Sequence, residues 1–70
     1  MSTRGDRGES GEEYVVTIDG QDSDVLPRGR AMDRGQYNGE TLRKTVEVRR
    51  LRAGRSSVLV AAWKNGRKTK

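Results

Sequence analysis

The fold of this chain is decided by the stretch KTVEVRRLRAGRSSVLVAAW, residues 44–63. Its first part, residues 44–49, alternates polar and apolar side chains, and its last part, residues 57–63, is a second extended run. Between them, Ala53-Gly54 can form a tight turn, because Gly54 accepts a positive φ without steric cost. The stretch therefore predicts a β-hairpin that turns at Ala53-Gly54.

Counting outward from that turn predicts one register for the hairpin. The opposed pairs are Val48 with Leu59, Val46 with Ala61 and Lys44 with Trp63. These pairs share a face, so we expect one apolar patch there, with the aliphatic stem of Lys44 on the indole. The patch consists of Val46, Val48, Leu59, Ala61 and Trp63.

A competing interpretation makes residues 41–53 a basic amphipathic helix, with Leu42 and Val46 one turn apart. In that case the fold class is α+β, with strands at residues 14–18 and 58–63 around the helix. The χ1 stiffness of Thr45, Val46 and Val48 lowers helix propensity, which favours the hairpin.

The segment before the hairpin supplies one further strand. Residues 14–18, YVVTI, are β-branched or aromatic, and Asp19-Gly20 is a strong turn signal. A weak return strand can follow and end at Val25 and Leu26. From residue 27 to 39 no period of two or 3.6 emerges, and Pro27 and three glycines interrupt the stretch, so the pattern predicts a long loop.

Together these elements predict a small β-rich single domain, a three-stranded antiparallel sheet with a C-terminal hairpin. The predicted boundaries are a disordered acidic and Gly-rich tail over residues 1–13, the domain over 14–63 with its loop at 27–39, and a basic C-terminal tail over 64–70 that starts with an Asn65-Gly66 turn. We expect Tyr14 and Trp63 in the core and Tyr37 exposed in the loop.

Composition excludes several classes of function. Hydrophobic residues are 30% of the 70-residue chain and charged residues 36%, with no Cys and no His. Disulfides, thiolate or imidazole metal ligands and catalytic dyads that use either residue are therefore excluded. We expect a protein that is not an enzyme and uses no metal and no cofactor. The sequence has no signal-like or membrane-spanning run, which predicts an intracellular protein without a membrane partner.

Charge is sorted along the chain. Residues 1–24 hold seven acidic and two basic residues, a net −5, and residues 25–70 hold three acidic and thirteen basic residues, a net +10. A half dense in Lys and Arg is typical of proteins that bind polyanions, because each neutralised phosphate releases condensed counterions.

These charges predict a small nucleic-acid-binding protein, regulatory or architectural, with DNA or RNA as its partner. Its phosphate contacts are expected from an Arg-rich hairpin and the C-terminal tail, through Arg43, Lys44, Arg49, Arg50, Arg52, Arg55, Lys64, Arg67, Lys68 and Lys70. Two alternatives stay open. One is a protein-interaction or assembly subunit, such as a phage or viral structural component or a homo-oligomer, and the other is an inhibitor of a basic partner.

Overall fold

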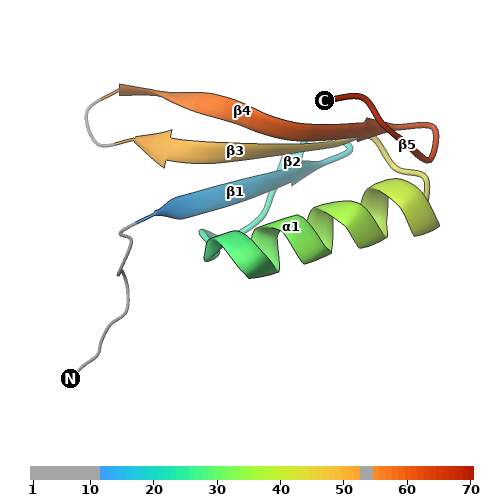
Figure 1. Ribbon diagram of the computed structural model, residues 1–70, viewed down its shortest axis with the longest axis horizontal. Coiled ribbons are helices and arrows are strands. Elements are labelled where there is room, and N and C mark those ends of the chain that lie inside the picture. The colour runs from blue at the N-terminus through green and yellow to red at the C-terminus, as the bar shows by residue number, and fades with distance from the viewer. Residues whose placement is uncertain (1–11, 53–54) are drawn as a thin grey trace.

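The chain forms a five-stranded antiparallel sheet with one helix packed across one of its faces (Figure 1). This computed structural model describes residues 12–52 and 55–70. The strands are β1 (Glu13–Ile18), β2 (Gln21–Asp22), β3 (Val46–Arg52), β4 (Arg55–Lys64) and β5 (Arg67–Lys68), in the spatial order β2-β1-β3-β4-β5. The domain is small, compact and mostly β-sheet. The sheet has five strands where the sequence predicts three, because a two-residue strand is added at each edge.

The predicted hairpin is confirmed, and the helix expected as an alternative at residues 41–53 is wrong. β3 and β4 pair along their length, and Arg52 opposite Arg55 is the pairing next to the predicted turn. The turn dipeptide itself, Ala53-Gly54, lies outside the described residues, as do residues 1–11 of the predicted tail.

The predicted register of this hairpin is wrong by two residues in its inner half. Val48 pairs with Ala61 and Val46 with Trp63. The cause is two irregularities, each of which adds one extra residue on β4. Between the Arg52 and Arg50 pairs β4 advances three residues while β3 advances two, and between the Arg49 and Val48 pairs β4 advances two while β3 advances one. Four of the five predicted patch residues are buried, but Leu59 lies opposite Arg49 on the other face, and Lys44 does not face Trp63.

Both predicted turns that contain glycine join two strands in a hairpin, and their turn type matches the right-handed twist of the strands. Asp19-Gly20 joins β1 to β2 with φ values of 49° and 87°, and Asn65-Gly66 joins β4 to β5 with 57° and 82°. Two consecutive positive φ values are the signature of a type I′ turn. A return strand follows the first turn as β2, but it ends at Asp22 and not at Val25 and Leu26, where Leu26 makes only an isolated bridge to Tyr14. The segment predicted as a basic tail contains β5.

The loop predicted over residues 27–39 is wrong, because this segment is helical. α1 (Arg28–Gln36) begins directly after Pro27 and runs on into a π-helical turn, η1 (Tyr37–Thr41). Its buried residues are Ala31, Gly35 and Gly39, spaced by four, which places them on one face of a helix. No helix in the described part of the chain is long and apolar enough to cross a membrane.

Small residues on α1 and η1 allow the helix to approach the sheet closely at Trp63. A Cβ added to Gly39 would lie 2.3 Å from both Cβ and Cγ of Trp63, and one added to Gly35 would lie 2.8 Å from Cγ2 of Val48. Since real Cβ atoms do not approach so closely, only glycine fits at these two positions. The core is thus a thin layer between helix and sheet, made by Tyr14, Val16, Ala31, Val46, Val48, Ala61 and Trp63.

The buried indole depends on one hydrogen bond from the end of the helix. Trp63 Nε1 donates to Oε2 of Glu40 at 3.0 Å. We expect Glu40→Ala to lower the free energy of unfolding by about 1–2 kcal/mol, because a buried donor would lose its acceptor. Glu40→Gln keeps an oxygen acceptor and should cost clearly less. Urea unfolding followed by the fluorescence of Trp63 measures both, and equal losses for the two variants would contradict the assigned role.

Candidate nucleic-acid interface

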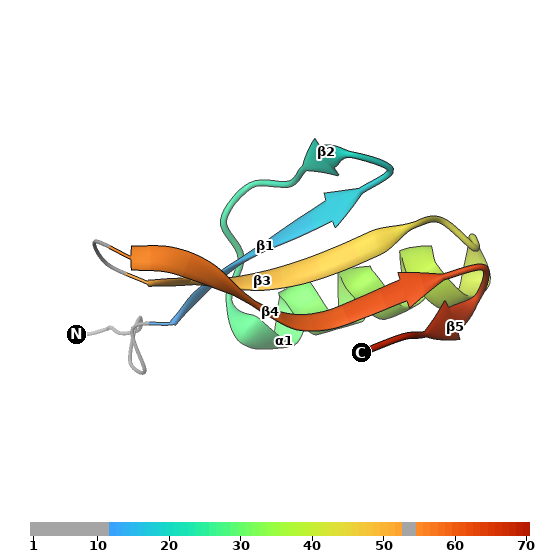
Figure 2. The same cartoon turned by 90° about the horizontal axis from the view of Figure 1, so that it is seen from above.

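In the folded protein, the acidic and basic segments of the sequence lie toward opposite edges of the sheet. Residues 12–24, which include β1 and β2, hold five acidic and no basic residues, whereas residues 55–70, which include β4 and β5, hold five basic and no acidic ones. Because β2 and β5 are the two outer strands, these groups occupy opposite edges (Figure 2). We call Glu13, Asp19, Asp22 and Asp24 the acidic edge. The basic edge comprises Arg43, Lys64, Arg67, Lys68 and Lys70.

A depression of about 650 Å³ lies at the basic edge, beside the turn between β4 and β5. Its lining consists of Arg43, Lys64, Asn65, Gly66, Arg67 and Thr69. Lys64 and Arg67 are directly paired across the hairpin, so both flank the type I′ turn. The sequence predicts this turn but not a concave site around it.

Arg43 reaches this depression from a different part of the chain. Its φ of 56° redirects the backbone between the end of η1 and the start of β3. Its side chain then lies along the turn, since a Cβ added to Gly66 would be 3.3 Å from Cγ and 3.5 Å from Nε of Arg43. Three cations from two separate segments therefore converge on one concave surface.

No carboxylate in the described part of the chain offsets these three cations. Within residues 12–52 and 55–70, Arg43, Lys64 and Arg67 make no ion pair, and the lining of the depression contains no Asp or Glu. Cationic side chains grouped without carboxylates attract anions, and Arg and Lys are the usual donors to phosphate oxygens. The depression is chemically suited to a phosphate group.

The other predicted contact residues do not join this group. Arg50, Arg52 and Arg55 lie toward the far end of the β3–β4 hairpin, and the nine steps along β4 from Arg55 to Lys64 span about 30 Å. Arg49 is half-buried and pairs with Glu47 on its own strand. Lys44 lines a separate recess that contains Asp19 and Asp22. The ten predicted residues thus form two clusters and two isolated positions.

One acidic residue, Glu12, does contact the β3–β4 hairpin. Oε2 of Glu12 lies 3.7 Å from Nε of Arg50, and the buried Tyr14 hydroxyl donates to Oε1 of Glu12 at 2.9 Å. Burial raises the pKa of the Tyr14 phenol, and its hydrogen bond to Glu12 raises it further. The phenol therefore stays protonated and remains a donor near neutral pH. This contact ties the start of β1 to β3, while the acidic edge stays on the other side of the sheet.

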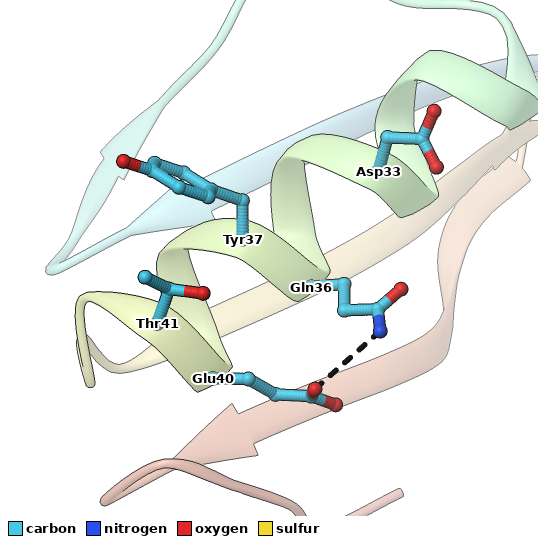
Figure 3. Close-up of a pocket in the computed structure, with 5 residues that line it drawn as sticks. All are labelled: Asp33, Gln36, Tyr37, Glu40 and Thr41. Carbon is cyan, nitrogen blue, oxygen red and sulfur yellow. Dashed lines mark hydrogen bonds between the residues drawn. The ribbon is translucent and has the colours of Figure 1, made fainter.

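The aromatic residues are placed where they cannot stack on bases at the basic edge. Tyr14 and Trp63 are buried, as the sequence predicts. The ring of Trp63 has Lys68 Nζ 6.0 Å from its centroid. Tyr37 is exposed, as expected, but it belongs to η1 and shares a shallow depression of about 290 Å³ with Asp33, Gln36, Glu40 and Thr41 (Figure 3). Two carboxylates beside it make that surface unfavourable for a phosphate backbone.

Comparisons with known proteins add no information on this surface. No family model, no curated protein and no solved structure matches the chain. Among the described residues, no acidic side chains group together in a way that could hold a metal ion. The candidate interface therefore rests on its own geometry and charge.

Proposed function

We propose that this protein binds nucleic acid by contacting backbone phosphates with its basic edge, in a regulatory or architectural role. The observation that carries the proposal is the convergence of Arg43, Lys64 and Arg67 on one depression whose described lining contains no carboxylate. Phosphate contacts of this kind supply the sequence-independent part of nucleic-acid affinity. Lys68 and Lys70, next to this site in sequence, add positive charge to the same edge.

The placement of the aromatic rings supports recognition of the backbone rather than of bases. Proteins that bind single strands through bases stack them on exposed aromatic side chains. The chain has three aromatic residues, of which two are buried and the third lies between carboxylates on the helix. Binding by charge alone favours duplexes, since their two strands give the higher density of phosphates.

The acidic edge supports the proposal by orienting the molecule rather than by cancelling its charge. Four strand spacings of about 4.8 Å separate β2 from β5, a distance of roughly 19 Å. At physiological ionic strength charges are screened beyond about 8 Å, so the carboxylate of Asp22 on β2 leaves the potential at β5 largely intact. A polyanion approaching the molecule is repelled from one edge and attracted to the other.

The proposal is tested by removing the three cations of the depression together. Fluorescence polarisation with labelled duplex DNA and duplex RNA gives the affinity of wild-type protein over a range of salt concentrations. We expect the triple variant Arg43→Ala, Lys64→Ala, Arg67→Ala to weaken binding at low salt by at least about tenfold. The slope of log K against log salt should become shallower by about 2–3, which is close to one unit per lost phosphate contact.

A matched control removes three exposed cations from α1. The variant Arg28→Ala, Arg30→Ala, Arg34→Ala has the same change in net charge, and we expect it to keep most of the affinity and the salt slope. Equal losses in the two triple variants would show that only net charge matters. Salt-independent binding, or no binding of wild-type protein to any duplex, would refute the proposed function.

A further inference from the structure

One face of the sheet is not covered by any helix or strand of residues 12–52 and 55–70. The helix packs on one side only, and the opposite face of β1, β3 and β4 is bare in both views (Figures 1 and 2). Strand alternation assigns most side chains of this uncovered face, since each has a buried neighbour in sequence, and Leu59 is added because it pairs with Arg49 at an irregularity in β4. The uncovered face comprises Val15, Thr17, Glu47, Arg49, Leu59, Val60 and Ala62.

The sequence of β4 is that of a strand covered on both faces. A strand with one solvated face alternates apolar and polar residues, whereas one buried on both faces is apolar without interruption. Residues 58–63 read VLVAAW, six apolar residues in a row. Of these, Ala61 and Trp63 face the helix, while Val60 remains 36% exposed. β4 is therefore more apolar than is required for a strand that a helix covers on one face only.

We propose that a second copy of this chain covers this face, forming a twofold-symmetric dimer of stacked sheets. Charge complementarity supports this occupant. A twofold axis parallel to the strands, in the plane between the sheets, places the acidic edge of each copy over the basic edge of the other. A twofold axis across the strands would instead place each edge over the same edge of the partner. The central charges, Glu47 and Arg49, neutralise one another within each copy.

The size of the face predicts a weak dimer. Three strands at about 4.8 Å spacing and six residues at about 3.3 Å rise give a patch of roughly 14 by 20 Å. This is about 280 Å² per copy, well below the roughly 800 Å² per partner of a standard interface, so association should be weak and depend on concentration. The strands of the two sheets should cross at about 30° because of the twist of each sheet.

The dimer also bears on the phosphate site, a consequence that rests on the proposed function. In the stacked arrangement the partner's acidic edge lies over the basic edge, where phosphates would bind. Phosphate and dimer partner would then compete for the same cations. By linkage, nucleic acid would dissociate the dimer to the same degree that dimerisation weakens nucleic-acid binding.

Sedimentation equilibrium and one pair of variants test whether the face associates. We expect wild-type protein to shift from monomer to dimer mass as its concentration rises from about 1 to about 100 µM. Val60→Glu places a charge on the uncovered face and should remain monomeric. Val25→Glu, at a position that is 51% exposed and outside this face, should dimerise like wild type. A wild-type monomer at every concentration, or equal behaviour of the two variants, would overturn the proposal.

Thiol cross-linking tests the orientation, because the chain has no cysteine of its own. Thr17 and Ala62 lie in one row across the sheet, each opposite Glu47. In the proposed dimer Thr17 of each copy faces Ala62 of the other, and because stacked sheets lie about 10 Å apart, a short bis-maleimide is needed to bridge two cysteines at these positions. The double variant Thr17→Cys, Ala62→Cys should therefore be cross-linked into dimers by this reagent, and either single variant should not. Cross-linking of Thr17→Cys alone would contradict the orientation, and so would a double variant that stays uncross-linked.

Discussion

Gly39→Ala is expected to destabilise the protein by about 2–3 kcal/mol, an overpacking effect at the upper end of what one added methyl group causes. The new Cβ would lie 2.3 Å from Cβ and Cγ of Trp63. Because Trp63 Cβ is fixed to the backbone of β4, a rotamer change cannot relieve the overlap, and the helix must move away from the sheet. Domains of this size rarely have more than about 3–5 kcal/mol of stability from their core.

The loss should be visible as a fall in Tm of roughly 10–20 °C, measured by circular dichroism and by the emission of the chain's single tryptophan. Gly29→Ala is the matched control, since no atom lies within 4 Å of the Cβ it would add. It should be neutral or stabilise by up to about 1 kcal/mol, the usual gain for alanine over glycine in a helix. If the two variants had similar Tm values, the close packing of helix on Trp63 would be refuted.

Gly35→Ala is expected to destabilise the protein by about 1–2 kcal/mol, and a second substitution at Val48 should offset part of this loss. Its Cβ would lie 2.8 Å from Cγ2 of Val48 and 2.9 Å from Cζ3 of Trp63. Val48→Ala removes the first of these atoms and by itself leaves a cavity in the core, at a cost of about 2 kcal/mol. The double variant should lose less stability than the sum of the two single losses, because the added methyl group fills part of that cavity.

A double-mutant cycle by urea unfolding measures this coupling. We expect a favourable interaction energy of at least about 0.5 kcal/mol between the two substitutions, as is usual for residues in contact. Val16→Ala offers the comparison, since Val16 is equally buried but is not among the atoms nearest to an added Cβ at residue 35. Additive losses for Gly35→Ala with Val48→Ala, within the error of the measurement, would contradict the packing described.

These glycines also explain why the helix is not predictable from the sequence. Gly35 and Gly39 suggest breaks in the chain, and glycine lowers helix propensity by up to about 1 kcal/mol per residue. In the structure they are the buried face, because the approach to Trp63 leaves no room for a side chain. A pattern search that counts only large apolar residues misses a stripe of Ala31, Gly35 and Gly39 at a spacing of four.

The hairpin is predictable because local signals determine it, whereas its register depends on distant packing. Alternation in β3 and the apolar run of β4 specify two strands and the position of the turn between them. The two bulges on β4 shift the pairing so that Trp63 meets Val46 beneath the helix. No turn residue or propensity marks those bulges, since the uninterrupted apolar run leaves every register of β4 acceptable.

The candidate site is predictable in composition but not in shape. Charge density identifies Lys64, Arg67 and the residues after them, and Asn65-Gly66 identifies the turn between them. Arg43 joins these residues, whereas Arg50 and Arg52 lie at the other end of the hairpin. This difference follows from the paths of η1 and β4, which sequence patterns do not specify. The sorting of charge into two edges likewise needs the strand order, which places β5 farthest from β2.

The claim that the basic edge carries phosphate contacts is tested most directly by mapping the binding surface on wild-type protein. Amide chemical shifts of ¹⁵N-labelled protein are followed by NMR as a short duplex is added at low salt. We predict that the largest changes occur at Arg43 and over residues 64–70, with the amides of residues 19–24 nearly unaffected. Changes concentrated at Arg50 and Arg52 instead, or spread evenly over both edges of the sheet, would contradict the assignment of the basic edge as the nucleic-acid interface.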